Sequence, residues 1–160
     1  MLDDFRGTPI AVDVLAGSCF MVKREVFEHV GMFNESLFMY AEDVDLCYMI
    51  HKAGYSINYT GMGTIVHHSG KSSSSAKDTH LSSVLQRESL AIFFEQRRGR
   101  FYAWLFKATT GIVAVFRITV LCCLLPFATR WSTELYIARD KWTRLLRWAL
   151  GLERWVIPIG

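Results

Sequence analysis

Short apolar runs interrupted by glycines characterise the first part of the chain, and they predict β-strands. Runs over residues 12–23, 55–59 and 64–67 have the length and composition of strands. Gly17 and Ser18 interrupt the first run, which indicates a bulge or a place where a ligand approaches the backbone. A serine-rich segment over 69–77 follows and is typical of a flexible loop or linker.

Apolar positions at helical spacing predict two helices between these strands. Residues 24–30 and 42–53 carry such positions, and each run is followed by a glycine, Gly31 or Gly54, that can end a helix. The second helix has an acidic first turn and Lys52 in its last turn, which suits the helix dipole. Strand and helix candidates thus alternate over residues 12–67.

The pattern becomes helical from residue 79 onward. Residues 79–96 are amphipathic, and residues 101–127 are strongly apolar apart from Lys107 and Arg117. The stretch 108–126 has one charge near its middle, and an Arg at the centre of a bilayer costs about 2.5 kcal/mol or more. A helix that lies in the membrane plane or re-enters the membrane is therefore at least as well supported as a spanning helix.

The last helical segment, residues 141–151, is basic, amphipathic and rich in tryptophan. Such a segment suits the surface of an anionic leaflet. The alternative is a helical hairpin packed on its own domain. The patterns together divide the chain into an α/β part (1–68), a linker (69–78) and a helical, membrane-associated tail (79–160).

Charge changes sign between the two parts of the chain. The net charge is +3, but residues 1–96 contain 7 Lys or Arg against 12 Asp or Glu, and residues 97–160 contain 11 against 3. A basic half suits nucleic acid or an anionic membrane. Four of the five tryptophans lie among Arg and Lys in residues 131–160, and residues 112–127 are apolar, so we expect a membrane surface and no nucleic acid. The four cysteines lack zinc-ligand spacing, and we interpret them as buried thiols in a reducing compartment.

Candidate chemistry is concentrated between residues 42 and 68. Three carboxylates, Glu42, Asp43 and Asp45, begin the second helix, and His67 and His68 end the last predicted strand. Carboxylates and a histidine at the ends of elements can form an acid–base and metal site. Strand alternation sends adjacent histidines to opposite faces, so at most one of them faces such a site. The alternative is a capped helix start and a histidine that is satisfied in the core.

Three blocks of residues occur in a specific order and spacing. They are Leu-Ala-Gly-Ser-Cys-Phe-Met-Val-Lys (15–23), Leu-Phe-Met-Tyr-Ala-Glu-Asp-Val-Asp-Leu-Cys (37–47), and Gly-Tyr-Ser-Ile (54–57) leading to Val-His-His-Ser-Gly-Lys-Ser (66–72). This order resembles the second half of the catalytic domain of family 2 glycosyltransferases, in particular the rhamnosyltransferase-like enzymes of bacterial surface-polysaccharide assembly. The resemblance is strong over residues 10–75 and loose over the helical tail.

The resemblance implies a fold and a reaction. The fold is α/β, the C-terminal half of a GT-A (nucleotide-diphospho-sugar transferase) fold, followed by membrane-associated helices. The reaction uses a nucleotide-sugar donor and a divalent metal ion (Mg or Mn), and it inverts the anomeric carbon during transfer to a lipid-linked or polysaccharide acceptor in surface glycan synthesis. The expected location is the cytoplasmic face of the bacterial inner membrane, peripheral or re-entrant.

The resemblance also assigns roles to individual residues. The general base that deprotonates the acceptor hydroxyl falls on Asp43, and a frequent metal ligand falls on His67. Glu42 and Asp45 would position Asp43 or bind the acceptor. Two further candidates, from the interruption of the first strand, would line the cleft: Gly17 and Ser18.

The chain departs from the family pattern in one large respect. Complete enzymes of this family carry a preceding nucleotide-binding half with an Asp-x-Asp motif, and nothing of that kind precedes residue 12. We therefore expect the acceptor-side part of an enzyme, as a fragment, a truncated reading frame or one piece of a split enzyme whose partner chain supplies the donor half. Alone it is expected to be inactive or nearly so. The alternative function is a non-catalytic module for membrane anchoring or interaction.

Overall fold

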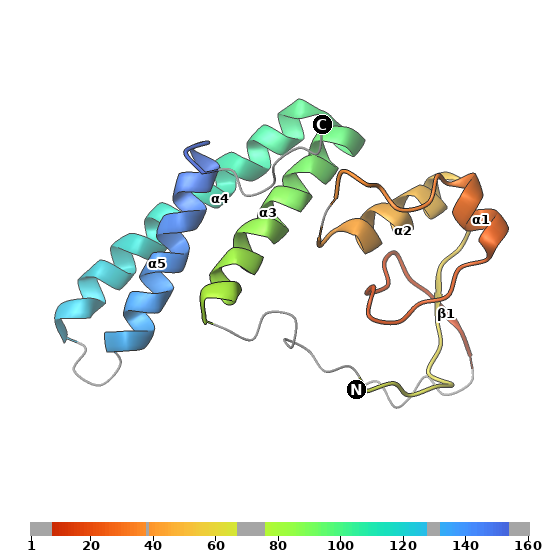
Figure 1. Cartoon of the computed structure of the whole chain (residues 1–160), viewed down its shortest axis with the longest axis horizontal. Helices are drawn as coiled ribbons and strands as arrows, with labels where there is room; N and C mark the ends of the chain where they lie inside the picture. The colour runs from red at the N-terminus through yellow and green to blue at the C-terminus, as the bar shows by residue number, and fades with distance from the viewer. Residues whose placement is uncertain (1–7, 38, 67–75, 128–131, 154–160) are drawn as a thin grey trace. The chain divides into compact units, whose positions relative to one another are not determined.

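The computed structural model describes residues 8–37, 39–66, 76–127 and 132–153 (Figure 1). The chain divides into two compact units, residues 1–72 and 73–160, and each is described here by itself. The described residues are mostly helical, with one small two-stranded sheet.

The sheet of the first unit is much shorter than the sequence predicts. It pairs β1 (Ile10–Ala11) with β2 (Asn58–Tyr59) in antiparallel register, with Ile10 opposite Tyr59 and Ala11 opposite Asn58. The amide of Val12 extends the pairing by donating to the carbonyl of Ile57 at 3.0 Å. Only the last two residues of the predicted strand 55–59 are therefore in a strand, and the described residues 64–66 are in none.

The prediction of a strand over 12–23 is wrong. The segment contains a turn at Gly17 and Ser18, and its described residues form no strand. The segment is instead an irregular loop, and its apolar side chains Leu15, Phe20 and Val22 pack against the core of the unit. The apolar content of the run thus reflects burial against a helix and not pairing with another strand.

Both predicted helices of the first unit are present. Helix α1 (Arg24–His29) is followed by Gly31 at φ 91°, and α2 (Glu42–Lys52) is followed by Gly54 at φ 85°. Glycine adopts this left-handed conformation without the steric cost that a side chain adds. The glycines therefore end both helices as the sequence predicts.

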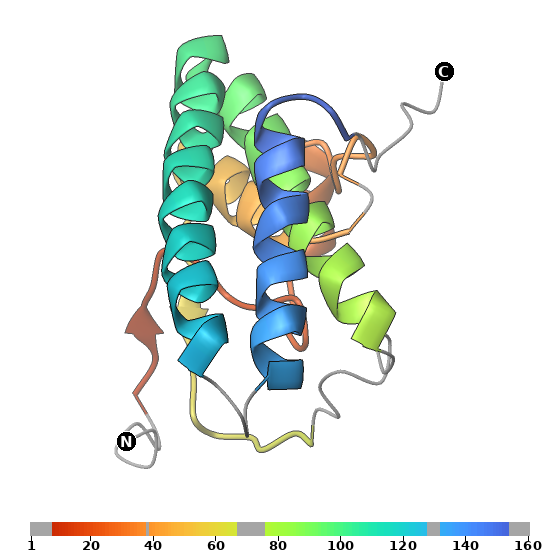
Figure 2. The same ribbon diagram turned by 90° about the vertical axis from the view of Figure 1, so that its left-hand side faces the viewer.

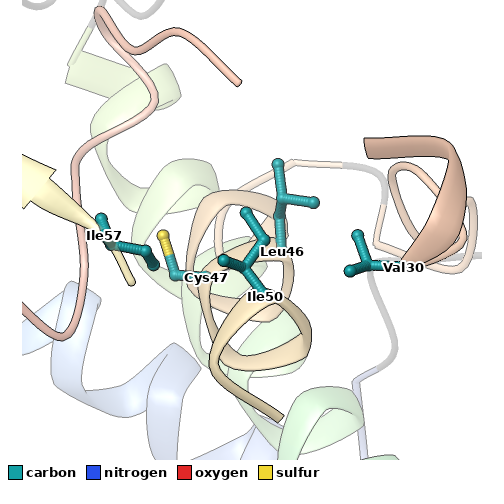
Figure 3. Close-up of a cluster of buried hydrophobic side chains, with 5 residues drawn as sticks. All are labelled: Val30, Leu46, Cys47, Ile50 and Ile57. Atoms are coloured by element: carbon teal, nitrogen blue, oxygen red, sulfur yellow. The ribbon is translucent and has the colours of Figure 1, made fainter. Parts of the chain in front are cut away.

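The core of the first unit is built around one face of α2. Figure 3 shows Leu46, Cys47 and Ile50 on this helix, with Val30 from the end of α1 on one side and Ile57 on the other. All five side chains are buried, and Leu46 is only 2% exposed. This face fixes how α2 sits in the unit, and hence where its acidic first turn lies.

The second unit consists of three long helices. They are α3 (Ala76–Arg98), α4 (Arg100–Leu124) and α5 (Ser132–Ala149), and a short 3-10 helix, η3 (Leu125–Phe127), ends α4. Gly99 at φ 93° separates α3 from α4. Both views show α4 and α5 side by side along their length (Figures 1 and 2). The pair is antiparallel, because Phe106 packs on Trp148 while Arg117 lies over Trp142.

The core of the second unit uses side chains that the sequence assigned to a membrane surface. Its buried residues are Val84, Ala91, Leu145 and Trp148, and Trp148 is 2% exposed. Trp142 is partly buried against the same cluster. Helix α5 therefore packs on its own unit, as in the hairpin alternative, and Trp148 is not available to a leaflet.

The cysteines also differ from the prediction. Cys47 is buried in the first core, but Cys19, Cys122 and Cys123 are exposed. All four are free thiols. The interpretation as buried thiols is correct only for Cys47, because the apolar run that contains the Cys122–Cys123 pair turns much of its surface outward.

Candidate functional site

The site is formed at the N-terminal end of α2. Tyr40 and Ala41 enter the helix with φ values of 67° and 63°, and the N-cap residue Ala41 makes no side-chain cap hydrogen bond. A non-glycine residue in the left-handed region costs about 1–2 kcal/mol. Local strain of this kind persists where surrounding structure imposes it, and it is frequent at functional sites. The two residues turn the chain so that the acidic first turn follows directly.

Asp43 is held in place by two backbone amides. The amide of Gly17 donates to Oδ2 at 2.8 Å, and the amide of Val44 donates to Oδ1 at 2.8 Å. Within the described residues these are its only hydrogen-bond donors, so each oxygen keeps a lone pair. The carboxylate is half-buried, because its own helix and the Gly17 turn flank it. The arrangement orients a carboxylate while leaving it able to accept a further hydrogen bond.

Gly17 and Asp43 lie close together although 26 positions separate them in the sequence. A Cβ atom added at Gly17 would lie 3.4 Å from Cβ of Asp43 and 3.5 Å from its Oδ2. An alanine methyl would therefore touch the carboxylate, and a larger side chain would push it aside. Ser18 is exposed beside it in the same turn. The structure thus brings the Gly17–Ser18 turn to the predicted base.

Asp45 occupies a different environment from Asp43. Its side chain is 2% exposed, and its Oδ2 accepts a hydrogen bond from Nδ2 of Asn34 at 3.3 Å. Asn34 Oδ1 in turn accepts from the amide and hydroxyl of Ser36, at 3.1 and 2.6 Å. Asp45 therefore fastens the loop that precedes the left-handed entry to α2, which fits a supporting role better than contact with an acceptor.

Replacing Asp45 by alanine is expected to destabilise the first unit by about 2 kcal/mol, because it removes the buried carboxylate and its hydrogen bond with Asn34. All five tryptophans lie in the second unit, so tryptophan fluorescence does not report on this change. Amide hydrogen exchange of α2 is the suitable measurement. Asp13→Ala is the control, because Asp13 is exposed. Equal exchange rates in the two variants would contradict the assigned role.

Glu42 presents an unusual oxygen atom. Its Oε2 is buried, and none of the described residues forms a hydrogen bond with it. A buried carboxylate oxygen normally finds a donor or a cation. However, the described residues contain no group of three His, Cys, Asp or Glu side chains that could hold a metal ion. The predicted ligand His67 and its neighbour His68 lie outside the described residues, so the described part of the chain does not by itself form a metal site.

Sequence reasoning missed Asn34 and the left-handed pair before α2. The sequence carries a signal for Asn34, because an Asn side chain often accepts a hydrogen bond from the backbone amide two residues later, which here belongs to Ser36. No comparable signal marks Tyr40 and Ala41, since neither residue type favours positive φ. Their conformation depends on the packing of the whole unit.

The chain is similar to curated glycosyltransferases. It is 39% identical over 83 residues to an N-acetylglucosaminyl-diphospho-decaprenol L-rhamnosyltransferase of Mycobacterium tuberculosis, which is 52% of this chain and 26% of the relative. It is 37% identical over 57 residues to the rhamnosyltransferase WbbL of Escherichia coli, covering 36% of this chain and 22% of the relative. A low-salt glycan biosynthesis hexosyltransferase, Agl10 of Haloferax volcanii, is 38% identical over 56 residues, covering 35% and 18%.

The matches therefore span about a quarter or less of these relatives. No family model matches the chain. No solved structure matches it either. The similarity confirms the resemblance to rhamnosyltransferase-like enzymes over about half of the chain.

Proposed function

We propose that this chain forms the acceptor-side part of an inverting glycosyltransferase with a GT-A fold, and that Asp43 is its general base. The observation that carries the proposal is the Asp43 carboxylate, which two backbone amides orient and which keeps a lone pair on each oxygen. The similarity to rhamnosyltransferases supports the reaction class. The donor is a nucleotide-sugar, and the acceptor is a lipid-linked or polysaccharide glycan at the cytoplasmic face of the membrane.

The chemical step assigns one proton to Asp43. The acceptor hydroxyl donates a hydrogen bond to the carboxylate, and its proton moves to the carboxylate as the oxygen attacks the anomeric carbon. The bond between this carbon and the leaving diphosphate breaks on the opposite side, which inverts the configuration. The electron pair of that bond leaves with the diphosphate. The Gly17 and Val44 amides keep the carboxylate from rotating during the step.

The neighbouring groups have supporting roles in this proposal. Asp45 fixes the loop before α2 through Asn34, and the Gly17–Ser18 turn borders the place of the acceptor hydroxyl. A Mg or Mn ion with His67 as a ligand stays part of the proposal by resemblance. When bound, such an ion would offset charge on the diphosphate. No step above depends on it, since the described residues do not form its site.

A chimeric enzyme tests the proposal within the region of similarity. The 83 matched residues of this chain replace their counterparts in the mycobacterial rhamnosyltransferase, and transfer of L-rhamnose to N-acetylglucosaminyl-diphospho-decaprenol is measured. We expect a folded, active chimera, because under this proposal the replaced segment supplies the general base. A folded chimera that binds donor but transfers no sugar would overturn the proposal. The segment would then be a non-catalytic membrane-anchoring or interaction module.

A further inference from the structure

One face of α4 is apolar and exposed from Phe101 to Phe116. Phe101, Leu105, Ile112 and Phe116 recur on this face at helical spacing and are 42–70% exposed. The opposite face carries the small buried residues of the helix, which pack on the rest of the unit: Ala103, Thr110 and Ala114. The face defined by the first four residues is called the outer face of α4 below.

The two charged residues of α4 that follow Arg100 lie toward α5. Lys107 Nζ lies 5.6 Å from the ring centroid of Trp148, and Arg117 Cζ lies 5.7 Å from that of Trp142. Both tryptophans belong to α5, so cation–π contacts direct both cations toward the partner helix. The sequence counts these charges against membrane contact, but both cations lie over rings of α5.

The charged residues of α5 distinguish between a spanning and an in-plane orientation of α4. Helix α5 runs antiparallel beside α4, and charged side chains are among its exposed residues. Arg144 pairs with Asp140 at 2.9 Å, and their side chains are 40% and 53% exposed. Helix α4 is long and apolar enough to cross a membrane. If it did so, these α5 charges would enter the hydrocarbon beside it, and each central charge is strongly disfavoured there.

Basic and aromatic residues meet at the start of α4. Arg97, Arg98 and Arg100 precede Phe101, and Trp104 is 63% exposed one turn later. Arginines attract anionic headgroups, and tryptophan side chains favour the boundary between headgroups and acyl chains. The outer face therefore has flanking residues whose chemistry suits a lipid interface.

We propose that the second unit binds an anionic phospholipid leaflet through the outer face of α4, with this helix lying in the plane of the interface and not spanning the bilayer. This inference deepens the membrane association of the proposed function. It does not depend on glycosyl transfer. The apolar side chains of α4 enter the leaflet, while the polar side of α5 stays in water.

Vesicle binding by the full chain tests the surface. Sedimentation with phosphatidylcholine vesicles containing phosphatidylglycerol is compared between the wild type and Ile112→Gln/Phe116→Gln. We expect partitioning to fall about tenfold or more, since two large apolar side chains lose their burial in lipid. The matched control is Tyr136→Gln/Ile137→Gln on α5, where two apolar residues are 51% and 45% exposed. All four positions are exposed, so helicity measured by circular dichroism should be unchanged.

The assignment of the outer face of α4 as the binding surface would be overturned if both double variants lost vesicle binding equally, or if the wild type did not bind. Equal binding to pure phosphatidylcholine would overturn the preference for an anionic leaflet. No sugar or nucleotide is present, so these results are independent of the chimera's activity.

Labelling with a membrane-impermeant maleimide tests the in-plane orientation. The reporter is Tyr136→Cys in a chain whose exposed thiols at Cys19, Cys122 and Cys123 are replaced by serine. In-plane binding leaves this position in water, so we expect labelling on vesicles at the rate seen without lipid. Protection by intact vesicles, lost when detergent is added, would show a spanning helix and overturn the orientation.

Discussion

Asp43→Asn is expected to lower sugar transfer by the chimeric enzyme about 100-fold or more, because an amide cannot take the proton of the acceptor hydroxyl. The loss should appear in kcat, since the shape of the side chain is retained. The substitution also has a structural cost. Two amides donate to the two carboxylate oxygens, so the Asn NH2 group must face one of those N–H donors. One hydrogen bond of about 1 kcal/mol is thereby lost.

The control must separate the loss of the base from this loss of stability. Asp13→Asn is the matched substitution in the same unit, because Asp13 is exposed. Gly17→Val is informative as a second variant: it keeps the carboxylate but displaces it, since even a Cβ lies 3.4 Å from Asp43. We expect low activity from Gly17→Val and full activity from Asp13→Asn. An Asp43→Asn chimera that retains most of its activity would rule out this residue as the base.

Trp148→Ala is expected to destabilise the helical unit by about 3–5 kcal/mol, as is usual when a buried aromatic side chain is removed. Trp148 is 2% exposed, its ring lies 6.4 Å from that of Phe106, and Lys107 lies over it. Truncation opens a cavity between α4 and α5 and also releases the cation. A loss of this size approaches the whole stability of many domains, so substantial unfolding should follow. Urea denaturation followed by helicity measures it.

The chain offers a control of the same residue type. Trp104 lies on α4 and is 63% exposed, so Trp104→Ala should change the free energy of unfolding by about 0.5 kcal/mol or less. The pair of variants separates a tryptophan that holds the unit together from one that is free to meet lipid. Similar destabilisation by both substitutions would contradict the assignment of Trp148 to the core.

Local signals in the sequence predict the helices well. Gly31 and Gly54 end α1 and α2, and an acidic first turn begins α2, because these features act within one turn of the residue concerned. The strand over 12–23 could not be judged in this way. An apolar run has the same appearance whether it pairs with a strand or packs on a helix, and only the position of α2 distinguishes the two.

The candidate site was predictable as a set of residues but not as an arrangement. The sequence indicates Asp43 and the Gly17–Ser18 turn separately, whereas their contact depends on the docking of α2. The sequence also does not distinguish Asp43 from Asp45 as a candidate base. In the structure, the side chain of Asp45 is buried against Asn34, whereas that of Asp43 is half-buried. Burial is a property of the folded unit, so spacing alone cannot separate a supporting carboxylate from a reactive one.

The contact between Gly17 and Asp43 has a consequence for the order of folding. It closes a loop of 26 residues, whereas the turns of α1 and α2 join residues a few positions apart. Closing a long loop costs chain entropy before any contact repays it, so local helices form earlier than such a pairing. The hydrogen bond from Gly17 is therefore expected to form after α2, so a nascent or partly unfolded chain can contain α2 while its carboxylate is held by the Val44 amide alone.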